Sequence, residues 1–441
     1  MKYNIYLSLF FLFFLVGYNS AQEQFTIQVE PFSINEAPGI QSYSLGKTTD
    51  GKWLIVGGRI DGLHKRRPFE AFLKKENNTS AFVIDPVTKK TWQADLDVLP
   101  ATIFEQLQST NQEFHQRNNT LYVIGGYGYS DTKRNHITYP NLTAIDIDGL
   151  VNAIINKSNI TSYFRQIADY NLAVTGGQLG LLNDTFYLCG GQYFEGRYNP
   201  MGPNHGPGFT QEYTNEIRTF KIVDDGTNLS IQEYSAIKDE QNLHRRDYNM
   251  VPQIFPDDTK GFTMFSGVFQ YDANIPWLNT VDVNETGYQV NNDFNQLLSQ
   301  YHSAKVPIYN SETKEMNTVF FGGLSQYHYD ENGKLVKDDD VPFVKTISMV
   351  VRNPDGLMIE KDLGIKMPAF LGSGAEFIPA SNETIYLENE IVDLNAFTKG
   401  KTLIGYIYGG IESSSENIFF RNNGTQSIAS NQIFKVYLTK R

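Results

Sequence analysis

The hexapeptide Leu121-Tyr122-Val123-Ile124-Gly125-Gly126 carries the strongest structural signal in the chain, because it is one of six copies of the same pattern. Each copy is a run of apolar, β-branched or aromatic residues that ends in two small residues. Strand-like runs precede and follow each doublet, which fits a repeated unit of four short strands with loops of variable length. The doublets are Gly57-Gly58, Gly125-Gly126, Gly190-Gly191, Ser266-Gly267, Gly322-Gly323 and Gly409-Gly410, at intervals of 68, 65, 76, 56 and 87 residues.

The repeat resembles kelch-type and galactose-oxidase-central-domain-like β-propellers, whose blades carry a Gly-Gly doublet at the end of the second strand. The resemblance implies an all-β, six-bladed propeller that forms one domain over residues 22–441. Glycine suits the doublet because the chain turns where neighbouring blades crowd and a Cβ would clash. Ser266 departs from the family pattern, and its late tryptophan is clearly kept only as Trp92. The expected blades cover approximately 40–99, 108–168, 171–240, 246–297, 301–366 and 370–441.

The two ends of the chain are expected to meet in one blade. The last repeat ends with the strand-like run 433–438 and has no fourth strand after it, whereas the run 25–29 precedes the first inner strand. We predict that 25–29 supplies the outer strand of blade six beside 433–438, which would leave no open edge in the ring.

Composition and the first residues indicate an exported protein. Of 441 residues, 37 are Lys or Arg and 49 are Asp or Glu, so an overall basic field for nucleic acid is missing. Residues 1–21 read as a cleaved signal peptide, with a positive start at Lys2 and an apolar run too short to span a bilayer. No later run is long enough either, so we expect a secreted or periplasmic chain without an integral membrane segment. The single cysteine, Cys189, excludes an intrachain disulfide framework.

One face of the expected propeller carries long loops. If the strands of each blade run a, b, c and d outward from the axis, the b–c loops and d–a connections share a face with the residues after each doublet. The b–c loops are 59–79, 127–140, 192–215, 268–278, 324–344 and 411–431, whereas several a–b turns on the opposite face are short. Long loops on one face of a rigid scaffold favour binding there. The seven histidines are expected at this face: His64, His136, His205 and His328 in b–c loops, and His115, His244 and His302 near the starts of inner strands.

Several side chains around this face are candidates for chemistry or binding. His115 and His136 are candidates for acid–base work, and Arg246 is a candidate for holding a carboxylate or sulfate. A resemblance to propeller polysaccharide lyases, which use His and Tyr as acid and base and Arg to neutralise a uronate, implies Tyr193 or Tyr248 as the tyrosine partner. Arg246 can equally pair with Asp247 to link adjacent blades. Further candidates for ligand contact are Tyr193, Glu195, Arg197, His244, Tyr301 and His302, each of which can equally serve packing within the blades.

Two functions from different classes fit this pattern. The preferred interpretation is a recognition module that binds an acidic carbohydrate or a protein partner through the long-loop face. The alternative is a carbohydrate-active enzyme, similar to propeller polysaccharide lyases or kelch-like sugar epimerases, that uses His, Tyr and Arg at the same face. Galactose-oxidase-like copper chemistry is disfavoured because it needs a cysteine linked to tyrosine, whereas Cys189 lies in an apolar strand. The sequence contains no zinc-type cluster, phosphate loop or dinucleotide fingerprint, so cofactor and metal remain unassigned.

Overall fold

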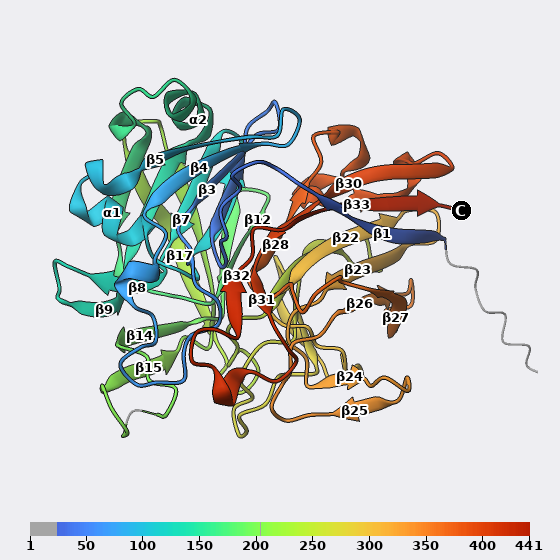
Figure 1. Cartoon of the computed structure of the whole chain (residues 1–441). Helices are drawn as coiled ribbons and strands as arrows, with labels where there is room; N and C mark the ends of the chain where they lie inside the picture. The colour runs from blue at the N-terminus through green and yellow to red at the C-terminus, as the bar shows by residue number, and fades with distance from the viewer. Residues whose placement is uncertain (1–23, 203) are drawn as a thin grey trace, which may run out of the picture.

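The chain forms a six-bladed β-propeller, in which six antiparallel sheets surround a central axis (Figure 1). This computed structural model describes residues 24–202 and 204–441, so the predicted signal peptide at 1–21 lies outside the described residues. Each blade has four main strands, and the fifth blade gains a short parallel strand, β29 (Val392–Asp393), beside its inner strand.

The strands of each blade follow one another along the chain, from the axis outward. Blade 1 contains β2 (Ser44–Lys47), β3 (Trp53–Val56), β4 (Ser80–Asp85) and β5 (Lys90–Asp95), and blade 2 contains β6 (Glu113–Arg117), β7 (Thr120–Ile124), β10 (Asn141–Asp146) and β11 (Phe164–Ala168). Blade 3 contains β12 (Gln178–Leu182), β13 (Thr185–Cys189), β16 (Glu216–Asp224) and β17 (Leu229–Lys238), and blade 4 contains β18 (Asn249–Ile254), β19 (Lys260–Phe265), β20 (Thr280–Asn284) and β21 (Gly287–Asn291). Blade 5 contains β22 (Ala304–Asn310), β23 (Glu315–Phe321), β26 (Thr346–Arg352) and β27 (Met358–Lys366), and blade 6 contains β28 (Ala375–Pro379), β30 (Gly400–Gly409), β33 (Ile433–Lys440) and β1 (Phe25–Phe32).

The outer strand of blade 6 comes from the beginning of the chain. Strand β1 pairs antiparallel with β33, with Phe25 opposite Lys440 and Phe32 opposite Ile433. Figure 1 shows β1 and the C-terminus side by side at the rim of this blade. The pairing ties the first described strand to the last one.

Secondary structure also occurs in the connections. Within the b–c loops lie the hairpins β8 (Tyr127–Ser130)–β9 (Asn135–Thr138), β14 (Gln192–Gly196)–β15 (Phe209–Tyr213), β24 (Tyr327–Tyr329)–β25 (Leu335–Lys337) and β31 (Ile411–Ser413)–β32 (Ser427–Ala429). The two α-helices are α1 (Ala101–Leu107) and α2 (Ile147–Ile155). In Figure 1 the four hairpins lie toward the lower side of the molecule, which is the long-loop face, and α2 lies at the upper side. We call the upper side the turn face.

The doublets turn the chain against the next blade. All twelve doublet residues have positive φ, between 57° and 97°, and Ser266 adopts φ 57° at the single position where a glycine is replaced. A Cβ added to Gly125 would lie 2.0 Å from the carbonyl oxygen of Val174, and one added to Gly322 would lie 1.8 Å from that of Leu371. Both oxygens belong to the segment that enters the following blade. Glycine is therefore required here by conformation and by space.

The hydrophobic core is divided among the junctions between blades. Six principal clusters of buried apolar residues each span two neighbouring sheets, because every sheet is covered by a neighbour on both faces. The blade 6–blade 1 junction joins Tyr408 to Tyr43 and Trp53. The cluster between blades 4 and 5 is the smallest of the six in the described chain and includes Phe265 and Phe320. Packing of this kind around the whole circle closes the propeller.

A ring of backbone hydrogen bonds surrounds the axis at the starts of the inner strands. One residue per blade has a left-handed φ and contributes to this ring, called the neck below: Ser42, Asn111, Gly176, Asp247, His302 and Gly374. The amide of each of five of these residues donates to the carbonyl of the preceding blade's neck residue, at 2.8–3.3 Å. Between blades 4 and 5, the Asn249 side chain instead bonds the Gln300 carbonyl and the Ser303 amide.

Candidate functional site

The long-loop face is covered by the b–c loop of blade 1, residues 59–79. This loop lies against the b–c loop of blade 6, where buried Asn422 donates to the carbonyls of Leu63 and His64 at 2.7 and 3.0 Å. On its other side, Arg197 of blade 3 donates to the Phe69 carbonyl at 3.0 Å. The loop therefore bridges blades that are far apart along the chain.

An aromatic cluster fixes this loop from below. The ring of His64 contacts Phe72, Tyr198 and Phe419, with centroid distances of 4.9–5.7 Å. Burial, together with the positive charge of Arg246, lowers the pKa of His64 to about 4, so the ring is neutral at pH 7. These contacts bring blades 1, 3 and 6 together over the axis.

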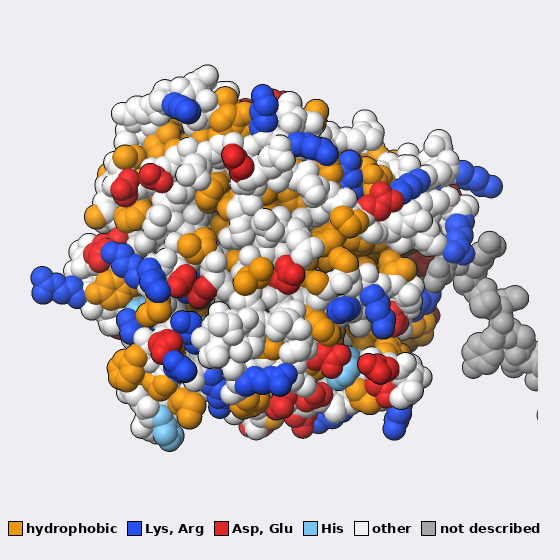
Figure 2. Space-filling model, viewed as in Figure 1, with side chains coloured by type: hydrophobic (Ala, Val, Ile, Leu, Met, Phe, Trp, Pro, Cys, Tyr) orange, Lys and Arg blue, Asp and Glu red, His pale blue; other side chains and the backbone are white. Residues whose placement is uncertain are grey.

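Basic and aromatic side chains project from the same loops. The guanidinium of Arg66 lies over the rings of Phe419 and Phe420, 4.9 and 4.3 Å from their centroids, and Phe420 is 58% exposed. We call this surface the basic-aromatic ridge; its residues are Lys65, Arg66, Arg67, Phe69, Arg197, Phe420 and Arg421. Figure 2 shows basic, acidic and hydrophobic side chains intermixed over the lower part of the molecule.

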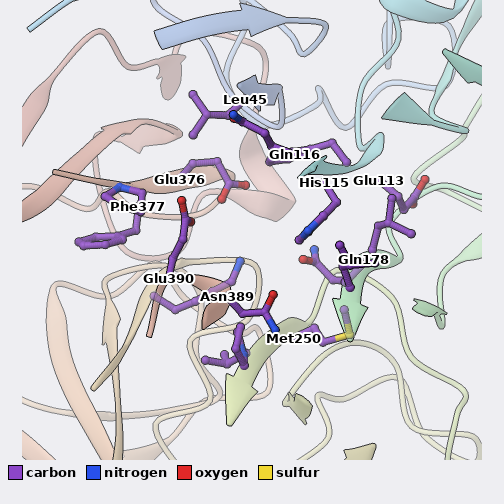
Figure 3. A pocket seen from close by; sticks show the side chains of 18 of the residues that line it. Leu45, Glu113, His115, Gln116, Gln178, Met250, Glu376, Phe377, Asn389 and Glu390 are labelled. Atoms are coloured by element: carbon purple, nitrogen blue, oxygen red, sulfur yellow. The ribbon is translucent and has the colours of Figure 1, made fainter. Parts of the chain in front are cut away.

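The axis holds a cavity of about 800 Å³ (Figure 3). It reaches from the neck, at Asp247 and His302, to the turn face, where Asn118 and 386–390 form its rim. Every inner strand contributes to its wall: Leu45, His115, Leu179, Met250, Lys305 and Glu376. The cavity therefore opens on the face opposite the long loops.

His115 and His302 are the candidates that line this cavity. His115 lies in the middle of β6, and burial, followed by the charge of Arg117, lowers its pKa to about 4. His302 is the neck residue of blade 5 and accepts a hydrogen bond from the Gly374 amide on its backbone carbonyl. A neutral imidazole at position 115 can exchange hydrogen bonds with a ligand without adding charge.

The other three residues considered for catalysis lie outside the cavity lining. Buried His136 contacts the Phe72 carbonyl through Nε2 at 2.8 Å. Arg246 donates to Asp247 Oδ2 at 2.6 Å and to the Tyr213 hydroxyl at 3.1 Å. Tyr248 is fully buried, and its hydroxyl donates to the Cys189 carbonyl at 2.7 Å. The structure thus does not gather His115, His136, Arg246 and Tyr248 around one substrate position.

The remaining candidates are distributed over the long-loop face. On the β14 strand, the Tyr193 hydroxyl donates to the exposed Glu195 carboxylate at 2.8 Å. His244 stacks on Tyr213 with a centroid distance of 3.7 Å and contacts the Asn215 side chain through Nδ1. Half-buried Tyr301 precedes the neck residue His302. Arg197 belongs to the basic-aromatic ridge described above and donates to the Phe69 carbonyl there.

Reasoning from the sequence did not single out the ridge residues Arg66 and Phe420. The run Lys65-Arg66-Arg67 was a visible signal, but the partner ring comes from a loop more than 350 positions later. The cavity residues Lys305 and Glu376 were also missed, because the long blade 6 segment 380–399 that helps to shape the cavity was not recognised as an a–b insertion.

The described residues contain neither a metal-binding cluster nor a membrane-spanning helix. There, no group of three or more His, Cys, Asp or Glu side chains is arranged to hold a metal ion. Cys189 is buried, as expected, and burial raises its pKa to about 12. No helix within residues 24–202 and 204–441 has the length and apolar character needed to cross a bilayer.

Comparison with known proteins found no protein-family model that matches the chain and no matching curated protein.

Proposed function

We propose that this protein is an exported, kelch-type recognition propeller that binds an acidic carbohydrate through the basic-aromatic ridge of its long-loop face. The observation that carries the proposal is the stacking of Arg66 on Phe419 and on the exposed ring of Phe420. A guanidinium can bind a carboxylate or sulfate through two hydrogen bonds, and an exposed aromatic ring offers a flat surface to a sugar.

The charges of the ridge support an anionic partner. Lys65 and Arg67 share one carboxylate, that of Glu70, at 3.4 and 3.1 Å. Arg66, Arg197 and Arg421 form no ion pair with any carboxylate of the described residues. Among the described residues, Glu70 is therefore the only carboxylate ion-paired with these five cations, on a chain whose formal net charge is −12. Cations without a carboxylate partner attract anions to this face, whereas the negative charge of the rest of the surface repels anions.

The family assignment and export rest on separate support. The kelch-type assignment is supported by the six doublets with left-handed φ at the ends of the second strands. Export is supported by the charged start, short apolar run and small residues of 1–21.

The proposal is tested by affinity electrophoresis of the mature chain in gels that contain a sulfated polysaccharide, a polyuronate or neutral dextran. We expect retardation by at least one of the anionic glycans and none by dextran. Arg66→Ala and Phe420→Ala should each weaken binding by at least about fivefold, corresponding to about 1 kcal/mol. Binding should weaken as the salt concentration is raised, because counterions are released when the arginines bind the sulfate or carboxylate groups of the glycan.

Lys361→Ala is the matched control, because Lys361 is an exposed cation on the outer strand β27. It should change the affinity by less than about twofold. Retardation by none of the glycans, or equal losses for Arg66→Ala and Lys361→Ala, would refute carbohydrate binding at the ridge. Growth of ultraviolet absorbance from unsaturated uronate products would instead support the lyase alternative.

A further inference from the structure

We propose that the axial cavity on the turn face binds a zwitterionic small molecule, an α-amino acid or short peptide with an apolar side chain. Glu376 would hold its ammonium group and Lys305 its carboxylate. This site lies on the opposite side of the neck from the basic-aromatic ridge, so the inference goes beyond the proposed function and does not depend on it.

Comparison of the six blades shows where the cavity departs from its repeat. The register places one residue of each inner strand opposite the residue two positions before the doublet. These six equivalent residues all line the cavity: Leu45, Phe114, Leu179, Met250, Lys305 and Phe377. Five are apolar, and blade 5 alone supplies a charged side chain. Lys305 therefore interrupts an apolar layer that would otherwise surround the axis.

The preceding layer, one residue closer to the neck, contains the second departure. Its members are Ser44, Glu113, Gln178, Asn249, Ala304 and Glu376. Glu113 is buried and accepts a hydrogen bond from the Gly177 amide at 2.8 Å, and Ser44 and Asn249 also bond neighbouring blades. Glu376 is half-buried and faces the cavity, where Figure 3 shows it beside Glu390 and across from His115.

The charged groups of Glu376 and Lys305 have no side-chain partner among the described residues. Neither forms an ion pair or a side-chain hydrogen bond there, although their strands β28 and β22 are neighbours. Glu376 lies two residues after the neck residue Gly374, and Lys305 lies three residues after the neck residue His302, so both side chains start near the neck. Two opposite, partly desolvated charges that do not satisfy each other are complementary to a ligand that carries both signs.

The other walls fit the rest of such a ligand. Leu179, Met250 and Phe114 provide an apolar surface for a side chain, and Gln116 and Gln178 provide neutral hydrogen-bonding groups. A volume of about 800 Å³ exceeds that of a single amino acid and admits a short peptide. The cavity opens on the turn face, so a free ligand enters from that side. Residues 386–390 narrow this opening, where the Lys47 ammonium lies 3.8 Å from the Glu390 carboxylate.

The test is isothermal titration of the mature chain with leucine and with alanyl-leucine, each compared with its N-acetylated and its C-amidated form. We expect at least one of the two zwitterions to bind, and blocking either end should weaken its binding by at least about tenfold, as for loss of a charge-assisted hydrogen bond. Glu376→Gln should weaken the binding of the zwitterion by a similar factor but leave the affinity for the N-acetylated form unchanged. Lys305→Met should likewise weaken the binding of the zwitterion but leave the affinity for the C-amidated form unchanged.

Glu383→Gln serves as the matched control, because Glu383 is an exposed carboxylate of the same rim and should alter the affinity by less than about twofold. Far-ultraviolet circular dichroism of each variant establishes that it is folded. Absence of binding by both zwitterions, or equal binding of free and blocked forms, would overturn the proposal. Loss of glycan binding in Arg66→Ala with amino-acid binding retained would separate this site from the ridge.

Discussion

At the scale of single residues, the doublet glycines carry most of the information that specifies the fold. Two successive left-handed φ values favour two successive glycines, which can be recognised in the sequence without a structure. The six doublets therefore predicted both the number of blades and the face on which the long loops lie. The same reasoning fails for His136. A histidine in a loop can face solvent or be buried under a neighbouring loop, and here the Phe72 carbonyl that receives it lies 64 positions away.

The first prediction separates the conformational role of a doublet glycine from its spatial role. Gly322→Ala places a Cβ 1.8 Å from the Leu371 carbonyl oxygen at φ 63°, whereas Gly226→Ala meets no atom within 4 Å at φ 86°. Both variants incur the left-handed strain of about 1–2 kcal/mol, and Gly322→Ala should lose about 1–3 kcal/mol more through overpacking. Urea denaturation measures both losses, and equal values would show that the doublet is not packed against the next blade.

The second prediction concerns pH. His64, His115 and His136 each have a pKa of about 4, first because of burial, against about 6.5 in an unfolded chain. The unfolded state therefore binds more protons than the folded state between these two pKa values. The contribution of each histidine to the free energy of unfolding is fully present above pH 6.5 and is lost as the pH decreases toward 4. For each histidine, the loss between pH 6.5 and 5 should be about 1.5 kcal/mol. His136→Gln keeps a donor for the Phe72 carbonyl and should remove one such contribution in unfolding curves; an unchanged pH dependence would show that His136 is not buried neutral.

At the scale of elements, the loop 59–79 is the feature that the sequence did not reveal. Its length predicted a role at the long-loop face, but the sequence contains no sign that it crosses to blades 3 and 6. The contacts that place it join residues far apart in the chain, such as Asn422 and Leu63 at a separation of 359 positions. Such partners leave no local pattern, so the ridge could be found only after folding had brought the loops together.

The third prediction tests whether Asn422 holds this loop in place. Asn422→Ala removes the hydrogen bonds to the Leu63 and His64 carbonyls beside the tryptic sites Lys65 and Arg66. Local opening should become more favourable by about 1–3 kcal/mol, and cleavage at these sites in limited trypsin digestion should accelerate accordingly. Asn423→Ala is the control, since within residues 24–202 and 204–441 its side chain accepts hydrogen bonds from Thr425 alone. Equal cleavage rates would mean that the loop is held by other contacts.

At the scale of the whole molecule, the ring is continuous but not uniform. The sequence predicted six equivalent blades and identified Ser266 as a departure, and the structure places that departure at the junction of blades 4 and 5. This junction has the smallest of the six clusters, and the buried polar atoms Ser266 Oγ, Ser299 Oγ and the Gln296 amide have no partner there among the described residues. Buried polar groups without partners weaken packing, so this junction is the expected point of first opening.

The fourth prediction follows from the side chain that replaces a backbone bond in the neck. Asn249→Ala leaves the Gln300 carbonyl and the Ser303 amide unpaired, which should cost about 2–3 kcal/mol and speed amide exchange most in β18 and β22. Gln178→Ala, at the equivalent position of blade 3, removes a side chain without any such hydrogen bond in the described chain and should have a much smaller effect. Faster exchange spread evenly over all blades would contradict a weak junction between blades 4 and 5.

The central claim is that an acidic glycan is recognised by the long-loop face, with the loops 59–79 and 411–431 side by side on it. The most direct measurement is hydrogen–deuterium exchange of residues 22–441 with and without the anionic polysaccharide that gives the strongest retardation in the gels. We predict slower exchange in 59–79 and 411–431, with residues 380–399 on the turn face unchanged. Protection confined to 380–399, or no difference in either loop at saturating glycan, would contradict the account.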